Sequence, residues 1–173
     1  TFPSDIIKKS VAVGLYDIGE SKIQEAETKI TEVGHIARYH LIGHLQSNKI
    51  KKAVQLFDVI QSVDSFELAK EISRRAGELE RVMECYIEVN SSGEPQKYGI
   101  APDRTIDLVK QVIELPHIKL SGLMTIGPLT DNPDKVRDAF RMVHELFHQA
   151  QESAGEQFDG LSMGMSGDFP LAI

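Results

Sequence analysis

Short apolar runs alternate with longer amphipathic segments along most of the chain. The apolar runs are rich in β-branched and aromatic residues and are bounded by turn residues, which is typical of buried strands. They predict strands at 15–19, 39–42, 57–61, 85–90, 120–126 and 161–165. The amphipathic segments predict helices at 4–14, 21–33, 47–56, 64–79, 102–115 and 133–154, and a last one from 168 onward.

Polar residues mark where several of these helices are expected to begin. Two pairs have the spacing of a capping box, in which side chains bond free N–H groups of the first turn: Ser21 with Gln24, and Asp64 with Glu67. Ser47 and Asn132 are expected to cap two further helices. Pro102 suits the first position of another helix, where its missing N–H costs nothing.

The order of elements is one helix followed by six strand–helix units, which predicts an α/β fold with a parallel sheet in a single domain, 1–173. Two architectures fit this order. A doubly wound open sheet usually carries a glycine-rich first turn, G-x-G-x-x-G, and none is present. The pattern therefore favours a (β/α)8 TIM barrel that lacks its first and last strands, because a leading helix implies a strand before it.

Composition narrows the class of protein. The 173 residues carry a formal net charge of −7, so the broad basic surface of a general nucleic-acid binder is not expected. No apolar run is long enough to span a membrane, and no secretory signal opens the sequence. The one cysteine, Cys85, lies in an apolar run, where a buried and unreactive thiol is expected. These features indicate a cytoplasmic protein, and the start at Thr1 indicates an incomplete chain.

The segment 161–168, Leu-Ser-Met-Gly-Met-Ser-Gly-Asp, offers the clearest candidate site. A strand runs directly into Gly164, Ser166 and Gly167, and a helix follows. Glycines let backbone N–H groups approach a ligand, and a helix start favours negative charge, so the segment resembles a phosphate cradle without lysine. Alternatively, Ser166 or Asp168 simply caps the helix and the glycines form the turn.

Three other strand ends carry polar or soft side chains, each of which also has a purely structural interpretation. His40, His44 and Gln46 follow one strand, where ligand contacts are common in barrels, although each can equally be a packed or surface residue. Asn90 ends another strand, and Lys97 lies in the polar loop after it. Met124, beside Gly122 inside a strand, can contact a planar ring or simply fill the core. The histidines lack the carboxylate or thiol spacing of a metal site.

Together these segments resemble the pyridoxal phosphate homeostasis proteins, which are built like the barrel domain of alanine racemase. The resemblance extends along the chain in order and is carried by four motifs: Gly19-Glu20-x-x-x-Gln24-Glu25, His40-x-Ile42-Gly43-x-Leu45-Gln46-x-Asn48-Lys49, Ser121-Gly122-Leu123-Met124, and Leu161-Ser-Met-Gly-Met-Ser166-x-Asp168 with Ala172-Ile173.

The resemblance implies a binding site for pyridoxal 5'-phosphate (PLP). It implies a Schiff-base lysine immediately before Thr1, outside the sequence, and a phosphate contact from Ser166, with Gly164 and Met165 shaping the turn. The other implied cofactor contacts are Met124 as a wall of the ring pocket, His40 and Asn90 at strand ends, Lys97 near the cofactor oxygens, and Ser21. The family usually has Asn at the position of Ser21, so that contact is expected to be weaker or water-mediated.

The expected function is therefore storage, buffering or delivery of PLP without catalysis, by a monomer whose partners include PLP and apo-enzymes that receive it. One alternative is a PLP-dependent racemase or aldolase, which needs an acid–base group such as His40 or Tyr98. Another is a barrel that acts on a sugar phosphate without PLP.

Overall fold

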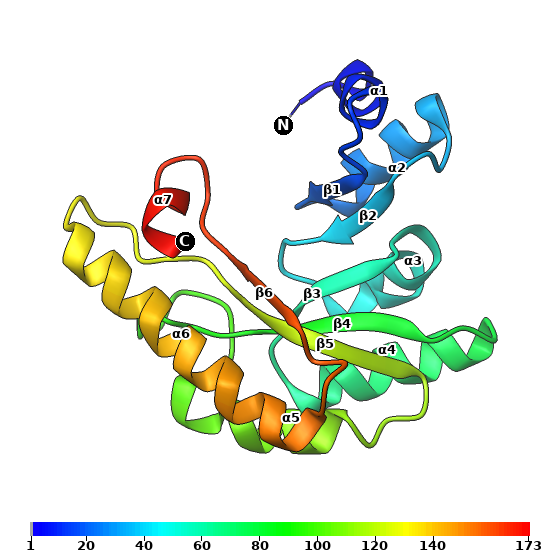
Figure 1. Ribbon diagram of the computed structural model, residues 1–173. Helices are drawn as coiled ribbons and strands as arrows, with labels where there is room; N and C mark the ends of the chain where they lie inside the picture. The colour runs from blue at the N-terminus through cyan, green and yellow to red at the C-terminus, as the bar shows by residue number, and fades with distance from the viewer. Residues whose placement is uncertain (1) are drawn as a thin grey trace.

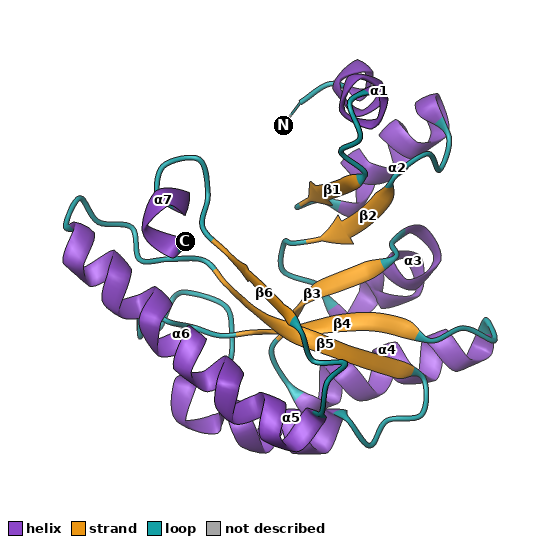
Figure 2. Ribbon diagram, in the orientation of Figure 1, coloured by secondary structure: helices purple, strands orange, loops and turns teal. Residues whose placement is uncertain are grey.

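The computed structural model describes residues 2–173 and contains one parallel sheet with helices along its outer face (Figures 1 and 2). Its six strands follow one another in sequence order, β1-β2-β3-β4-β5-β6. Each neighbouring pair is parallel. The strands are β1 (Asp17–Glu20), β2 (Arg38–Leu41), β3 (Val59–Val63), β4 (Met83–Glu88), β5 (Ile118–Thr125) and β6 (Gly160–Met163).

A helical segment connects each strand to the next, as parallel pairing requires. The helices are α1 (Ser4–Ala12), α2 (Ile23–Val33), α3 (Ile50–Leu56), α4 (Phe66–Glu78), α5 (Thr105–Val112), α6 (Pro133–Ala154) and α7 (Phe169–Ala172). Single 3₁₀ turns, η1 (Ser47–Lys49) and η2 (Pro102–Arg104), lead into α3 and α5. The α/β prediction is confirmed, and predicted and observed boundaries differ by only a few residues.

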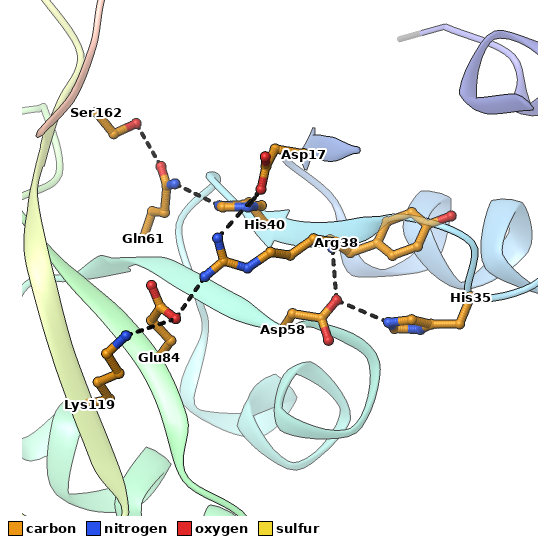
Figure 3. A network of polar contacts seen from close by, with 10 residues as sticks. Asp17, His35, Arg38, His40, Asp58, Gln61, Glu84, Lys119 and Ser162 are labelled. Atoms are coloured by element: carbon orange, nitrogen blue, oxygen red, sulfur yellow. Dashed lines mark hydrogen bonds and ion pairs between the residues drawn. The ribbon is translucent and has the colours of Figure 1, made fainter. Parts of the chain in front are cut away.

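The sheet is strongly curled, as expected for part of a barrel. Strands in a sheet lie about 4.8 Å apart, so β3 and β6, three positions apart, would be separated by roughly 14 Å in a flat sheet. Instead the Ser162 hydroxyl on β6 donates a hydrogen bond of 2.8 Å to the side-chain oxygen of Gln61 on β3. Figure 3 shows both side chains reaching across the concave side of the sheet. The barrel is therefore favoured over the open sheet.

The two faces of the sheet differ in chemistry. Side chains that point toward the helices form a continuous apolar core, with Tyr39, Ile60, Ile87 and Leu123 fully or almost fully buried. The thiol of Cys85 belongs to the same core, so its expected burial is confirmed, and this burial raises its pKa. Side chains on the concave side are largely polar and form the network described below.

The predicted helix caps are only partly correct. Asn132 caps α6 by accepting hydrogen bonds from the N–H groups of Asp134 and Lys135, as expected. The expected caps Ser21 and Ser47 are wrong, because α2 and α3 begin without a side-chain cap. At α4 the cap is Ser65, whose hydroxyl accepts from the Leu68 N–H, one residue after the expected Asp64. Pro102 opens η2 as predicted.

No helix within residues 2–173 combines the length and the apolar composition needed to cross a membrane.

Candidate functional site

Loops from the carboxyl ends of β4, β5 and β6 meet around Gly127. The Lys97 ammonium, from the loop after β4, donates a hydrogen bond of 3.0 Å to the Gly127 carbonyl and lies 3.2 Å from a Glu94 carboxylate oxygen. A Cβ atom on Gly127 would lie 3.2 Å from a carboxylate oxygen of Asp168, from the loop after β6. Three strand ends that are distant in sequence thus form one rim, the usual place for ligand sites in barrels.

The loop after β6 presents free hydrogen-bond donors. Gly164 adopts φ +86°, and a Cβ there would lie 2.9 Å from the Phe169 Cα, so a side chain is excluded. Ser166 and Gly167 are exposed, and within residues 2–173 neither the Ser166 hydroxyl nor the two N–H groups find a partner. Free N–H and O–H donors on a glycine-shaped turn are suited to an anion.

Asp168 occupies one donor of this loop. It stands at the N-cap position of α7 without capping the helix through its side chain. Instead its carboxylate accepts the Met165 N–H, which draws the loop into a tight turn. The Met165 side chain is exposed. Of the donors in this turn, those of Ser166 and Gly167 therefore remain available, and the Met165 N–H does not.

Asn90 shapes the loop after β4. Its side-chain nitrogen donates to the carbonyls of Glu94 and Lys97, and its oxygen accepts from the Ser92 hydroxyl and the Gly93 N–H. The Asn90 side chain, which is predicted to contact a ligand, therefore forms its hydrogen bonds within its own loop. Through the Lys97 carbonyl it also fixes the segment that carries the Lys97 ammonium toward the rim.

The loops after β1 and β2 form the opposite part of the rim. A Cβ on Gly43 would lie 2.2 Å from the Ser21 carbonyl oxygen, so the glycine allows these loops to touch. Ser21 and His44 line a small cavity of about 160 Å³ between them. The His44 ring stacks on Tyr98, with ring centroids 3.8 Å apart and planes 10° apart, and so joins this part of the rim to the β4 loop.

His40 lies deeper than its predicted place at the rim. It is 9% exposed and points into the concave side of the sheet, where one ring nitrogen is 2.9 Å from Asp17 and the other 2.8 Å from Gln61 (Figure 3). If the Gln61 amide nitrogen donates to His40 Nδ1, then Nε2 carries the proton toward Asp17. Both nitrogens are thus engaged within the protein, and the cofactor contact of His40 stays a prediction.

A charged layer lies beside this histidine, nearer the amino ends of the strands. The Arg38 guanidinium bridges Glu84 at 2.7 Å and Asp17 at 3.5 Å, and Lys119 lies 3.8 Å from Glu84 (Figure 3). These four residues come from four different strands. Together with His40, Gln61 and Ser162, they link β1 to β6 through side chains.

Met124 and Glu88 lie side by side on β5 and β4, near the carboxyl ends of these strands. The two residues are paired in the sheet register, and they are 3% and 5% exposed. Burial, with a smaller contribution from the negative charge of Asp64, raises the pKa of Glu88 to about 7. Met124 is therefore a buried neighbour of a carboxyl group with a raised pKa, and its role as a wall of the ring pocket stays a prediction.

Glu88 and Gln61 are two residues of the site that were not predicted from the sequence. Glu88 stands two residues before Asn90, and residues two apart in a strand point to the same side. Because Asn90 is a predicted site residue, this spacing is the sequence signal that could have identified Glu88. Gln61 lies in a strand that reads as apolar, and its partners His40 and Ser162 are remote in sequence. Only the curl of the sheet brings these three together.

Comparison with known proteins shows which sequences and structures this chain is similar to. The family model described as "Alanine racemase, N-terminal domain" matches residues 5–172. The pyridoxal phosphate homeostasis protein of Aquifex aeolicus is 38% identical over 174 residues, which covers 100% of this chain and 76% of that protein.

Solved structures agree with the sequence matches. PipY of Synechococcus elongatus without PLP superimposes with a TM-score of 0.92 at 36% identity, covering 99% of this chain and 81% of PipY. PipY with PLP bound superimposes with a TM-score of 0.88 at 34% identity and the same coverage. An alanine racemase of Clostridium difficile, at 14% identity and a TM-score of 0.80 over 94% of this chain and 44% of the racemase, shares the fold alone.

Proposed function

The chain belongs to the alanine racemase N-terminal domain family, among the pyridoxal phosphate homeostasis proteins, and from that premise we propose that it binds PLP and serves the intracellular homeostasis of this cofactor. It would store, buffer or deliver PLP in the cytoplasm as a monomer, with apo-enzymes as recipients. PipY, with the same fold, has been solved with PLP bound.

The observation that carries the proposal is the set of free donors in the loop after β6. The Ser166 hydroxyl and the N–H groups of Ser166 and Gly167 have no partner within the described chain, and all three are exposed. A phosphate group is an acceptor of several hydrogen bonds and takes N–H and O–H donors of this kind. Gly164 keeps the turn open, because any side chain there would collide with Phe169.

The remaining contacts are assigned by their position around the rim. Met124 would form a wall of the ring pocket, since it faces the interior below the loops. Lys97 would lie near the cofactor oxygens, with its ammonium held at Gly127. Ser21 and Met165 are exposed at the rim and would contact the cofactor from opposite sides. Asn90 and His40 would act indirectly, by fixing the β4 loop and the interior.

When bound, PLP supplies an aldehyde that condenses reversibly with an amine. We assign that amine to a lysine immediately before Thr1. Lys8 and Lys9 lie within α1 and are not candidates. Borohydride reduction of this chain with PLP, followed by mass spectrometry, is expected to modify no single lysine preferentially. Preferential modification of Lys97, the lysine at the rim, would contradict this assignment.

We propose that the protein does not catalyse a reaction on bound amino acids. The basis is the set of contacts made by the two candidate acid–base residues, His40 and Tyr98. Both ring nitrogens of His40 are engaged by Asp17 and Gln61, and Tyr98 stacks on His44. A racemase needs a group that exchanges a proton with the bound substrate. Incubation of the full-length, PLP-loaded protein, which includes the assigned lysine, with D-alanine or L-alanine is expected to leave optical rotation unchanged. Sustained racemisation would show that the carrier assignment is wrong.

The phosphate contact is tested by comparing two ligands that differ only in that group. Loss of one hydrogen bond to a charged group costs about 1.5–3 kcal/mol, so Ser166→Ala is expected to weaken PLP binding about tenfold or more. Binding of pyridoxal, which lacks the phosphate, is expected to stay unchanged. Ser153→Ala, at an exposed position of α6, is the control. Equal loss for both ligands, or for neither, would contradict the assignment.

A further inference from the structure

A cavity lies between the ends of β4 and β5 under the loop that Asn90 organises. Its volume is about 290 Å³, and a water molecule takes about 30 Å³ in the liquid, so it has room for a ligand of several non-hydrogen atoms. Its walls come from β4, the β4 loop and the residue after β5: Glu88, Val89, Asn90, Lys97, Tyr98 and Ile126.

Glu88 is the unusual member of this wall. The residue is 5% exposed, and Oε2 is completely enclosed without a hydrogen-bond partner. Within residues 2–173 no donor reaches this enclosed oxygen. A buried polar group without a partner costs about 1–3 kcal/mol, and more when it is charged, so such a group in a cavity wall indicates a missing donor.

The charges around Glu88 identify the kind of donor. Asp64, at the end of β3, adds a second negative charge, and its carboxylate has the His44 ring 3.9 Å away. The Lys97 ammonium does not neutralise Glu88, because it is engaged by the Gly127 carbonyl and by Glu94. The two charged residues of the cavity wall are therefore Lys97, whose ammonium is engaged elsewhere, and Glu88, whose enclosed oxygen still lacks a partner within the described chain.

We propose that this cavity binds a short primary amine, whose ammonium group donates to the Glu88 carboxylate. A hydrogen bond between an ammonium and a carboxylate is about twice as strong as a neutral one. The Ile126 side chain, which is 42% exposed, offers apolar surface to a short alkyl chain. The Tyr98 ring, stacked on His44, offers an aromatic face that favours a cation. This site goes beyond the proposed function, since it needs no PLP.

The site also has a predictable response to pH. Glu88 is protonated below its raised pKa of about 7 and then carries no charge for the ammonium. Amine affinity is therefore expected to fall about tenfold for each pH unit below that value, because binding must first remove the proton. Of the other titratable groups, Lys97 and Tyr98 line the cavity with Glu88. Outside its wall, Asp64 acts on Glu88 through its charge and lies near His44, and Glu94 pairs with Lys97.

The experiment follows the Glu88 carboxyl carbon by NMR in the whole chain without PLP, with n-propylammonium chloride as the probe. An opposite charge within about 4–6 Å lowers a carboxyl pKa by about one to three units, so saturating probe is expected to lower the Glu88 midpoint by that amount. Sodium chloride at equal ionic strength and 1-propanol are expected to cause no shift. Tetramethylammonium, which keeps the charge but lacks N–H donors, is expected to cause a smaller shift than the probe.

Two variants complete the test. Glu88→Gln is expected to abolish propylammonium binding measured by calorimetry, whereas Glu145→Gln, at an exposed position of α6, is expected to retain it. An unchanged Glu88 midpoint with the probe would overturn the proposal. So would binding of acetate that Lys97→Gln abolishes, since that would make the cavity an anion site. Because PLP is absent throughout, these outcomes are independent of the PLP assignment.

Discussion

Glu88 shows how one buried side chain couples the stability of the protein to pH. In the unfolded chain its carboxyl group has an ordinary pKa near 4.5, and in the folded chain burial and Asp64 raise it to about 7. The folded state therefore holds a proton that the unfolded state releases as the pH rises above about 4.5. The contribution of Glu88 to the free energy of unfolding falls between about pH 4.5 and 7, and then stays constant.

Glu88→Gln is expected to remove this dependence. The free energy of unfolding of the variant, measured by urea denaturation, should exceed that of the parent chain increasingly from about pH 4.5 to 7, by up to about 3 kcal/mol. The free energy of unfolding of both proteins is measured at each pH, so that the contributions of the other carboxylates cancel in the difference. A constant difference across this range would mean that Glu88 titrates normally in the folded state.

His40 illustrates the opposite case, a titratable side chain whose partners are all in place. His40→Ala removes the donor to Asp17 and the acceptor for the Gln61 amide, and it opens space in the interior. We expect a loss of about 2–4 kcal/mol in the free energy of unfolding, typical of breaking a buried polar network. His148→Ala, at an exposed position of α6, should cost less than about 0.5 kcal/mol. Similar costs for the two variants would contradict the network.

At the scale of elements, local sequence explains most of the fold. Every predicted strand and helix is present, because apolar periodicity reports directly on which side of an element is buried. Caps were predicted less well. Ser21 and Ser47 are suitable residue types, but Ser47 enters a 3₁₀ turn, and α2 begins at Ile23 with Lys22 at the N-cap position. Cap geometry depends on the path of the preceding loop, which residue spacing does not specify.

The caps at α4 and α3 make a direct comparison possible. Ser65→Ala removes the hydroxyl that accepts from the Leu68 N–H and should lower the free energy of unfolding by about 1 kcal/mol. Ser47→Ala removes no cap bond and should change it by less than about 0.5 kcal/mol. Thermal or urea denaturation of both variants measures the difference. A larger loss for Ser47→Ala than for Ser65→Ala would show that Ser47 caps its helix, as its position in the sequence predicts.

At the scale of the whole molecule, the curl of the sheet decides which residues meet. Sequence motifs indicated the loop 164–168, Met124 and Lys97, because glycines and polar residues after strands are local signals. They did not indicate that Gln61 joins His40 to Ser162, or that the loops meet at Gly127. Those contacts depend on how far the sheet bends, which is set by packing between strands that are distant in sequence.

Glycines in β5 and β6 allow this packing, because Tyr86 on β4 lies against them. A Cβ on Gly160 would lie 2.1 Å from the Tyr86 hydroxyl oxygen and 2.6 Å from two ring carbons. A Cβ on Gly122 would lie 1.8 Å from the Gly160 carbonyl oxygen. The first obstacle is a side chain and the second is backbone, so the two glycines should respond differently when Tyr86 is shortened.

Gly160→Ala and Gly122→Ala are each expected to lower the free energy of unfolding by at least about 1–3 kcal/mol, the usual cost of overpacking. In a Tyr86→Ala background the cost of Gly160→Ala should largely vanish, because its three nearest obstacles belong to the tyrosine. The cost of Gly122→Ala should remain, because a carbonyl oxygen still blocks the new methyl group. Gly167→Ala, with no atom within 4 Å of the added Cβ, is the control for stability. Relief of both costs by the tyrosine substitution would mean that Tyr86, and not direct contact between the strand backbones, limits how closely β5 and β6 approach.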